Sequence, residues 1–173
     1  MAGSLIKVNE VIVDTDVASV TLSGIDTTFD VYQVVLSNVV PATNGQSLRA
    51  RVTKGGYVQT DSNYDEANVG IRADSYAFND QVAQNASYWN KVGGWSTSSS
   101  SGSSGNAILY LFNFQNAEYS FITYECSTIF SGNCIGTQGG AVHTVNTASD
   151  GINFYFSSGD IDKGNFSLYG LNK

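Results

Sequence analysis

Apolar and polar residues alternate strictly near the C-terminus, and this alternation constrains the fold more than any other feature of the chain. Side chains two positions apart in a β-strand point to the same face, so a period of two predicts strands. The apolar face is formed by Ile152, Phe154 and Phe156 in one segment and by Phe166 and Leu168 in the next. A polar, glycine-flanked turn separates the two segments, which predicts a closing hairpin of an all-β sandwich.

The composition agrees with this fold class. Val, Thr, Ser, Asn, Tyr and Phe dominate the periodic segments, and 18 glycines against a single proline supply turns. A chain of 173 residues, 42% of them hydrophobic, can build one sizeable core. We therefore expect a single domain over residues 1–173, an antiparallel β-sandwich with jelly-roll or related Greek-key topology.

The same periodicity predicts roughly eight to ten short strands in the whole chain. Besides the closing pair, the candidate strands are residues 12–25, 28–39, 48–53, 57–60, 71–76, 107–114, 119–124 and 139–145. The nearly continuous apolar run at 107–114 predicts the middle of a sheet, with 119–124 as its neighbour. A Ser/Gly tract at 96–105 has no apolar area to bury and predicts a mobile surface loop.

Charge excludes several classes of partner. Eight basic and fifteen acidic residues give a net charge of −7, which disfavours contact with phosphate backbones and anionic lipid. The N-terminus lacks a basic segment followed by an apolar one, and no apolar run approaches the length of a membrane span. We expect a soluble protein without an evident export signal, which binds no nucleic acid and does not insert into membranes.

Two cysteines, Cys126 and Cys134, flank a seven-residue segment. If the flanking strands pair, a disulfide can close this loop. The alternative is two reduced thiols, which we favour because nothing in the sequence indicates secretion.

No residue pattern indicates catalysis. His143 is the only histidine, and a nucleophilic serine would need an elbow of the form Gly-x-Ser-x-Gly beside it. The sequence Gly102-Ser103-Ser104-Gly105 lacks that spacing. Glycoside hydrolysis needs a pair of carboxyl groups, one with a raised pKa, and the sequence around the acidic residues shows no apolar setting that would raise a pKa. We expect a protein that is not an enzyme and needs no cofactor.

Metal binding receives equally little support. A single histidine and two cysteines do not supply a zinc site. The acidic groups Asp61, Asp65 and Glu66 and the pair Asp160 and Asp162 do not match a calcium-binding loop, and we interpret them as solvated turns.

Aromatic residues provide one binding hypothesis. Tyr88, Trp89 and Trp95 lie near Gly93 and Gly94, and exposed rings of this kind can stack on sugar faces or anchor a protein interface. The structural alternative is that Trp89 plugs one end of the sandwich. Trp95, beside the Ser/Gly tract, is the ring expected to be exposed.

Most of the chain resembles small virion structural proteins of marine tailed bacteriophages. The likeness lies in residues 2–15, 18–25, 32–38, 48–52 and 107–124 and in the ending Leu168-Tyr169-Gly170-Leu171. It is weakest over residues 61–105. The resemblance implies a capsid decoration protein or a tail or fibre component, assembled in the host cytoplasm and located in the virion. It transfers no catalytic residue.

This resemblance suggests partners. Leu5, Ile6 and Val8 are apolar residues of an N-terminal segment, about 1–10, that has no obvious partner strand and can dock on a neighbouring subunit or another virion protein. We expect homo-oligomers, with a trimer as first choice, that bind the major capsid or tail protein. The leading expectation is a capsid decoration protein; the alternative is a tail or fibre module that binds a receptor or a host surface glycan.

Overall fold

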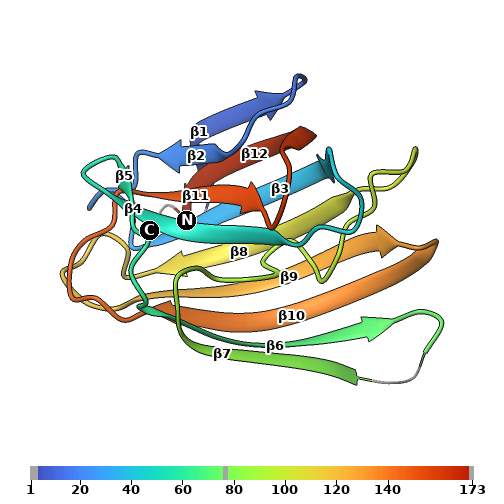
Figure 1. The fold of residues 1–173 in the computed structure, drawn as a ribbon. Coiled ribbons are helices and arrows are strands. Elements are labelled where there is room, and N and C mark those ends of the chain that lie inside the picture. The colour runs from blue at the N-terminus through green and yellow to red at the C-terminus, as the bar shows by residue number, and fades with distance from the viewer. Residues whose placement is uncertain (1–3, 76–77, 172–173) are drawn as a thin grey trace.

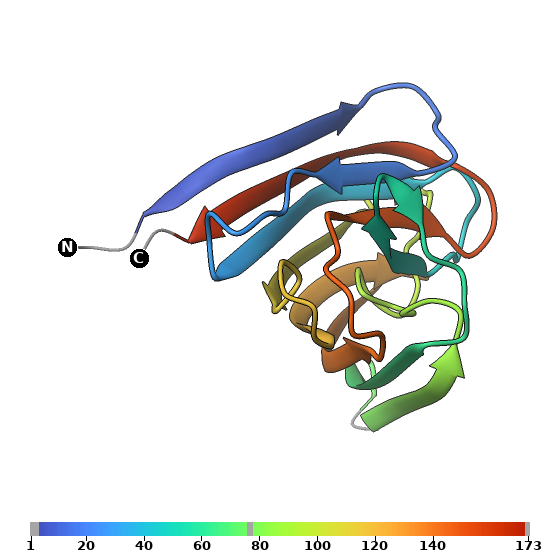
Figure 2. The same ribbon diagram turned by 90° about the vertical axis from the view of Figure 1, so that its left-hand side faces the viewer.

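A computed structural model describes residues 4–75 and 78–171, which form two antiparallel β-sheets packed face to face (Figures 1 and 2). The strands are β1 (Leu5–Val13), β2 (Val20–Ser23), β3 (Val31–Pro41), β4 (Leu48–Lys54), β5 (Tyr57–Val58), β6 (Tyr64–Arg72), β7 (Phe78–Ala86), β8 (Gly105–Phe112), β9 (Ser120–Phe130), β10 (Asn133–His143), β11 (Gly151–Phe156) and β12 (Ile161–Leu171). Over these residues the structure contains no helix that could span a membrane.

The order of the strands is that of a jelly roll with an extended sheet. The large sheet has the order β1-β12-β3-β8-β9-β10-β6-β7, and the small sheet has the order β2-β11-β4-β5. The first and last strands are thus neighbours in one sheet, and the second and second-last are neighbours in the other. This nested pairing is the jelly-roll arrangement, and the predicted all-β sandwich is confirmed.

The core lies between the sheets and is built by alternation. In β8, Leu109 and Leu111 are buried while Ile108 and Tyr110 are exposed, and β9 alternates in the same way over most of its length. The predicted central position of residues 107–114 and their pairing with 119–124 are confirmed by β8 and β9. Strict alternation would put Phe114 on the outer face with Ile108 and Tyr110, but Asn113 adopts a positive φ of 61° and Phe114 is buried in the core.

The predicted closing hairpin is wrong, although both of its strands exist. β11 pairs with β2 and β4 in the small sheet, whereas β12 pairs with β1 and β3 in the large one. The intervening turn therefore crosses from one sheet to the other. Both strands point their apolar residues at the same core, but from opposite sides, and alternation alone does not distinguish this arrangement from a hairpin.

The region of residues 61–105 contains two strands that the sequence pattern missed. β6 and β7 each have nine residues and form the far end of the large sheet. Glu66 and Asn68 occupy inward positions of β6, so the usual apolar alternation is hidden by polar residues. Of the strand predicted at 71–76, the structure assigns only Ile71 and Arg72 to β6, and residue 76 lies outside the described ranges.

The Ser/Gly tract is more ordered than predicted. Thr97 and Ser98 are buried, and the Thr97 amide donates a hydrogen bond of 3.0 Å to the carbonyl of Gln46. Gly105 already belongs to β8, and the fully exposed part of the tract is limited to residues 99–102. Backbone pairing with the segment before β4 holds the first part of the tract against the small sheet.

Candidate functional site

Trp89 belongs to the core and offers no ring to a ligand. Residues 88–97 run along the edge of β4 that faces away from β11, and Trp89 and Ala50 exchange backbone hydrogen bonds of 2.9 and 3.0 Å. The indole is 0% exposed, donates from Nε1 to the Val142 carbonyl at 3.0 Å and meets the Tyr64 ring edge to face. Trp89 therefore has a structural role inside the sandwich, which was the alternative to a binding role.

Trp95 is half-buried, not an exposed ring. Its Nε1 donates to Asn68 Oδ1 at 3.3 Å, and Lys91 Nζ lies 3.6 Å from the ring centre. A Cβ atom added to Gly70 would come within 2.9 Å of the indole nitrogen, so the ring lies against the β6 backbone at this glycine. Lys91 and Gly70 therefore occupy surface that a sugar would need.

Tyr88 is the one member of the predicted aromatic group that lies on the outside of the small sheet. Because neighbouring residues of an extended segment point in opposite directions, Tyr88 faces outward where Trp89 faces inward. It meets Arg49 and Arg51 of β4 and Tyr155 of β11, and we call these four side chains the arginine–tyrosine cluster.

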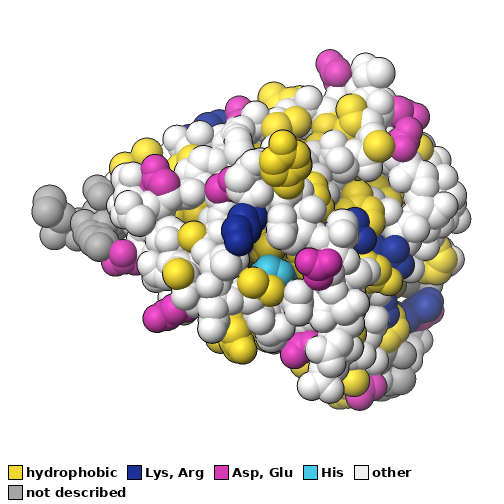
Figure 3. Space-filling view, turned by 60° about the vertical axis from the view of Figure 1, so that its left-hand side comes forward, with side chains coloured by type: hydrophobic (Ala, Val, Ile, Leu, Met, Phe, Trp, Pro, Cys, Tyr) yellow, Lys and Arg dark blue, Asp and Glu magenta, His cyan; other side chains and the backbone are white. Residues whose placement is uncertain are grey.

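The cluster is held together by cation–π contacts. The Arg49 guanidinium carbon lies 4.1 Å from the centre of the Tyr88 ring, and that of Arg51 lies 4.7 Å from the centre of the Tyr155 ring. Such contacts contribute about 0.5–1 kcal/mol each at exposed sites. Burial raises the pKa of Tyr155, and the two nearby guanidiniums oppose that rise. On the face shown in Figure 3, basic side chains lie directly beside hydrophobic ones.

A buried polar cluster lies on the other side of the 88–97 segment, against β6 and β9. Glu66 accepts a short hydrogen bond from the Asn90 amide, and burial raises the pKa of its carboxyl to about 7, against the opposing charges of Lys91 and Arg49. Glu66 Oε1 and the hydroxyl of Tyr124 have no hydrogen-bond partner within the described residues. Sequence reasoning placed Glu66 in a solvated turn, which is wrong because β6 directs it inward.

The buried polar cluster lacks the features of a catalytic site. Glu66 is only 5% exposed and is covered by the segment that carries Trp89 and Asn90. His143 is buried too, packs against Tyr64 with ring centres 4.7 Å apart and 40° between the planes, and has a pKa lowered by burial. Glu66 therefore changes its protonation state near neutral pH, but the residues that cover it leave a substrate no access to its carboxyl group.

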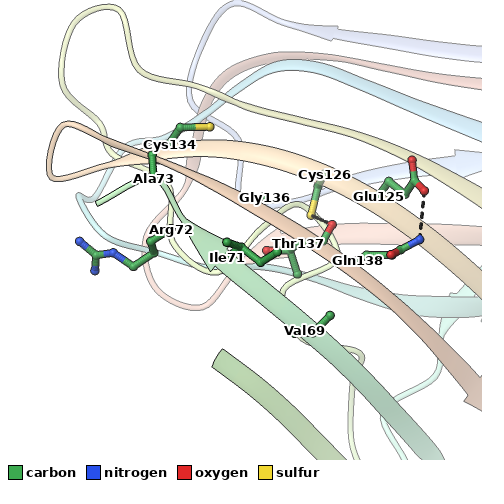
Figure 4. Close-up of a pocket in the computed structure, with 10 residues that line it drawn as sticks. All are labelled: Val69, Ile71, Arg72, Ala73, Glu125, Cys126, Cys134, Gly136, Thr137 and Gln138. Carbon is green, nitrogen blue, oxygen red and sulfur yellow. Dashed lines mark hydrogen bonds between the residues drawn. The ribbon is translucent and has the colours of Figure 1, made fainter. Parts of the chain in front are cut away.

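The outer face of the large sheet carries a shallow trough along β10. Gly136 and Gly140 point outward from β10, and an added Cβ atom would meet nothing within 4 Å at Gly136. Depressions of about 460 and 610 Å³ lie beside these glycines. Figure 4 shows the first, with Arg72 and Cys134 at one end and the hydrogen-bonded pair Glu125 and Gln138 at the other.

Apolar side chains surround this trough on the same face. Strand register places Ile108 and Tyr110 of β8 beside Glu125 and Thr123 of β9, and places Phe78 and Val82 of β7 beside Ile71 and Ala67 of β6. The large exposed members are Ile71, Phe78, Val82, Ile108, Tyr110 and Phe121. Sequence reasoning missed this surface, although the outward positions of β8 and β9 carry apolar residues where a solvated sheet carries polar ones.

The two cysteines cannot form the disulfide considered from the sequence without rearrangement of the sheet. Register places Cys126 opposite Thr137 and Cys134 opposite Ile129, and alternation puts Cys126 on the buried face and Cys134 on the exposed face. Both thiols are free. Burial raises the pKa of Cys126 to about 12, and its sulfur lies 3.5 Å from the Thr137 carbonyl.

The N-terminal segment has a partner strand within its own chain, contrary to expectation. Leu5 and Ile6 lie in β1, which pairs with β12 at the edge of the large sheet, and both side chains are exposed. Val8 lies at a register irregularity and packs against the core. Docking of this segment on another subunit stays a prediction; β1 offers one free edge and the exposed Leu5 and Ile6, and residues 1–3 lie outside the described ranges.

Among the described residues, no three His, Cys, Asp or Glu side chains are placed to hold a metal ion. The chain matches no protein-family model, no curated protein and no solved structure. Fold and surface define a jelly-roll sandwich with two distinct outer faces, one largely apolar and one with the arginine–tyrosine cluster.

Proposed function

We propose that the chain is a non-enzymatic structural protein of a bacteriophage virion, a capsid decoration protein that forms homo-oligomers on the particle surface. The sequence resemblance suggests the virion. The outer face of the large sheet supports the assembly role, because it exposes Tyr110, Phe121 and Ile108 on two adjacent central strands. Contiguous exposed apolar surface of this kind marks protein interfaces.

A second copy of this chain is the occupant we propose for that face. Neighbouring strands lie about 4.8 Å apart and residues rise about 3.3 Å, so five strands of nine residues cover roughly 700 Å². A specific interface buries about 800 Å² per partner. The strands β8, β9, β10, β6 and β7 therefore provide an area of the required size. The outward charges of these strands are Asp65, Asp80, Glu125 and Arg72, and the apolar side chains between them supply the area that a second copy would cover.

Light scattering over a range of protein concentrations tests the self-association. We expect an oligomer, a trimer as first choice, that the double variant Tyr110→Ala/Phe121→Ala converts to monomer. Tyr57→Ala is the matched control, since Tyr57 is an exposed aromatic residue on the small sheet. A wild-type monomer at high concentration, or an oligomer unaffected by the double variant, would contradict the proposed interface.

Location requires a separate experiment. Quantitative mass spectrometry of purified particles of the virus that encodes the chain should find it in hundreds of copies if it decorates the head. Only a few copies per particle, with label at the tail in electron microscopy, would favour the tail or fibre alternative. Absence from the particle would overturn the virion role.

A further inference from the structure

We propose that the arginine–tyrosine cluster is a binding site for the carboxylate of an acidic saccharide. This inference goes beyond the proposed structural role and depends neither on self-association nor on location in the particle. It rests on the placement of Arg49, Arg51, Tyr88 and Tyr155 and on the charges around them.

Strand register explains why the four side chains meet. Arg49 and Arg51 are two residues apart in β4 and share its outward face, and Tyr155 of β11 is the direct partner of Arg49. The backbone bridge between Ala50 and Trp89 brings Tyr88 alongside from the other edge of β4. The cluster is thus built on three paired segments of backbone, so its geometry is set by the sheet.

The guanidinium groups are oriented but form no ion pair in the described part of the chain. Arg51 Nε donates to the Ser87 carbonyl at 2.9 Å, and both guanidiniums lie over tyrosine rings. Neither of them forms an ion pair with a carboxylate in the part of the chain that the structure describes, where Arg72 and Lys7 do. Arg49 Nε is a buried polar atom without a hydrogen-bond partner in that same part, and the Tyr155 hydroxyl lies close enough to Arg49 for that side chain to oppose the rise that burial causes in its pKa.

Two guanidinium groups that lie over tyrosine rings favour an anion whose charged group is planar and has two oxygen atoms. A guanidinium forms paired hydrogen bonds with a carboxylate, and a ring stacked beneath it limits its motion before binding. The chain has only eight basic against fifteen acidic residues, so two arginines on one face without an ion pair among the described residues are a local exception to its charge, with Glu66 as a carboxyl that the Arg49 charge also affects. That overall negative charge opposes long phosphate polymers, whereas a single carboxylate on a largely neutral sugar meets little repulsion.

The surroundings favour a saccharide over a peptide. An extended peptide binds well along a free strand edge, but β4 is paired with β11 on one side and with β5 and the 88–97 segment on the other. One sugar ring needs only a small platform, and tyrosine rings supply apolar area for its C–H groups. The glycan hypothesis thus moves from Trp89 and Trp95, which are covered, to Tyr88 and its neighbours.

Calorimetry with oligogalacturonate, and with its methyl ester as the uncharged control, tests the proposal on the purified chain. We expect saturable binding of the acid and no binding of the ester. Arg49→Gln and Arg51→Gln should each weaken binding by about tenfold or more, the effect of losing a hydrogen bond to a charged group. Arg72→Gln is the matched control, because Arg72 lies in β6, in the other sheet, and already pairs with Asp74.

Three other results would contradict the proposal. Equal binding of acid and ester would replace the carboxylate site by a neutral sugar platform and overturn the assignment. Binding of a glutamate peptide as tight as that of the oligosaccharide would overturn the saccharide specificity. Absence of saturable binding to oligogalacturonate and to a sialylated oligosaccharide, with every variant folded by circular dichroism, would overturn the site itself.

Discussion

The ring of Phe154 in β11 lies 5.8 Å from the ring of Phe166 in β12, with 44° between the two planes. These strands follow one another in the chain but belong to different sheets. Their contact therefore crosses the core. Residues 157–160 connect the two strands and cross from one layer of the sandwich to the other.

Removing either ring should destabilise the whole domain. Phe154 and Phe166 are fully buried, so Phe154→Ala or Phe166→Ala should cost about 3–5 kcal/mol of unfolding free energy, which is the usual range for phenylalanine in a core. Denaturant unfolding followed by tryptophan fluorescence measures this. Tyr57→Ala, at an exposed position outside the proposed interface, is the control and should change the unfolding free energy little. Equal effects at Tyr57 and Phe166 would contradict the burial of Phe166.

The sequence predicted the strands better than their pairing. Alternation identifies β4 and β11 because each places its aliphatic and Phe residues on one face, and that face is inside. It says nothing about which strand lies next to which, since a hairpin and a crossing between layers bury the same residues. The connection from β11 to β12 was therefore mispredicted.

The candidate sites were harder to predict for a related reason. Tyr88 and Trp89 are adjacent in sequence, yet one faces out and the other is fully buried, because the segment pairs with β4 at Ala50. Arg49 and Arg51 form an outward pair through the alternation that the sequence does show, but their tyrosine partners come from distant segments. Glu66 was misplaced because charged residues at inward positions break the pattern used to find strands.

Two glycines of β10 should respond oppositely to the same substitution. A Cβ atom at Gly139 would lie 2.5 Å from the Tyr124 ring, so Gly139→Ala should cost about 1–3 kcal/mol through overpacking. At Gly136 the Cβ atom meets open space, so Gly136→Ala should be neutral or stabilise the strand by up to about 1 kcal/mol. Thermal unfolding of the two variants makes the comparison. A loss of stability at Gly136 equal to that at Gly139 would contradict the trough.

The two thiols should differ in reactivity. Cys134 is exposed, whereas Cys126 is buried with a pKa raised to about 12 and so contains little thiolate at neutral pH. One thiol per chain should react quickly with Ellman's reagent in native protein, and two should react after denaturation without reductant. Cys134→Ser should abolish the fast reaction. Failure to find two thiols in denatured, unreduced protein would show that a disulfide forms.

Glu66 should make stability fall as pH rises through the acid-to-neutral range. Its pKa is about 7 in the folded chain, against an ordinary 4.5, so between these values the folded state holds a proton that the unfolded state has lost. Below pH 4.5 both states are protonated and the group has no effect. Its contribution therefore declines from about pH 4.5 to pH 7 and is constant above, with a total loss of up to about 3 kcal/mol.

The variant Glu66→Gln isolates this effect, because an amide can accept the Asn90 hydrogen bond without carrying a charge. Urea unfolding at pH 5, 6, 7 and 8 should show that the unfolding free energy of the variant rises relative to that of the wild type as pH rises. Most of this relative rise should be complete near the folded pKa of about 7. Glu118→Gln, at an exposed position, controls for the general change in charge. A variant less stable than the wild type by the same amount at every pH would show that Glu66 is ionised throughout, stabilised by Lys91 and Arg49 more strongly than burial opposes it.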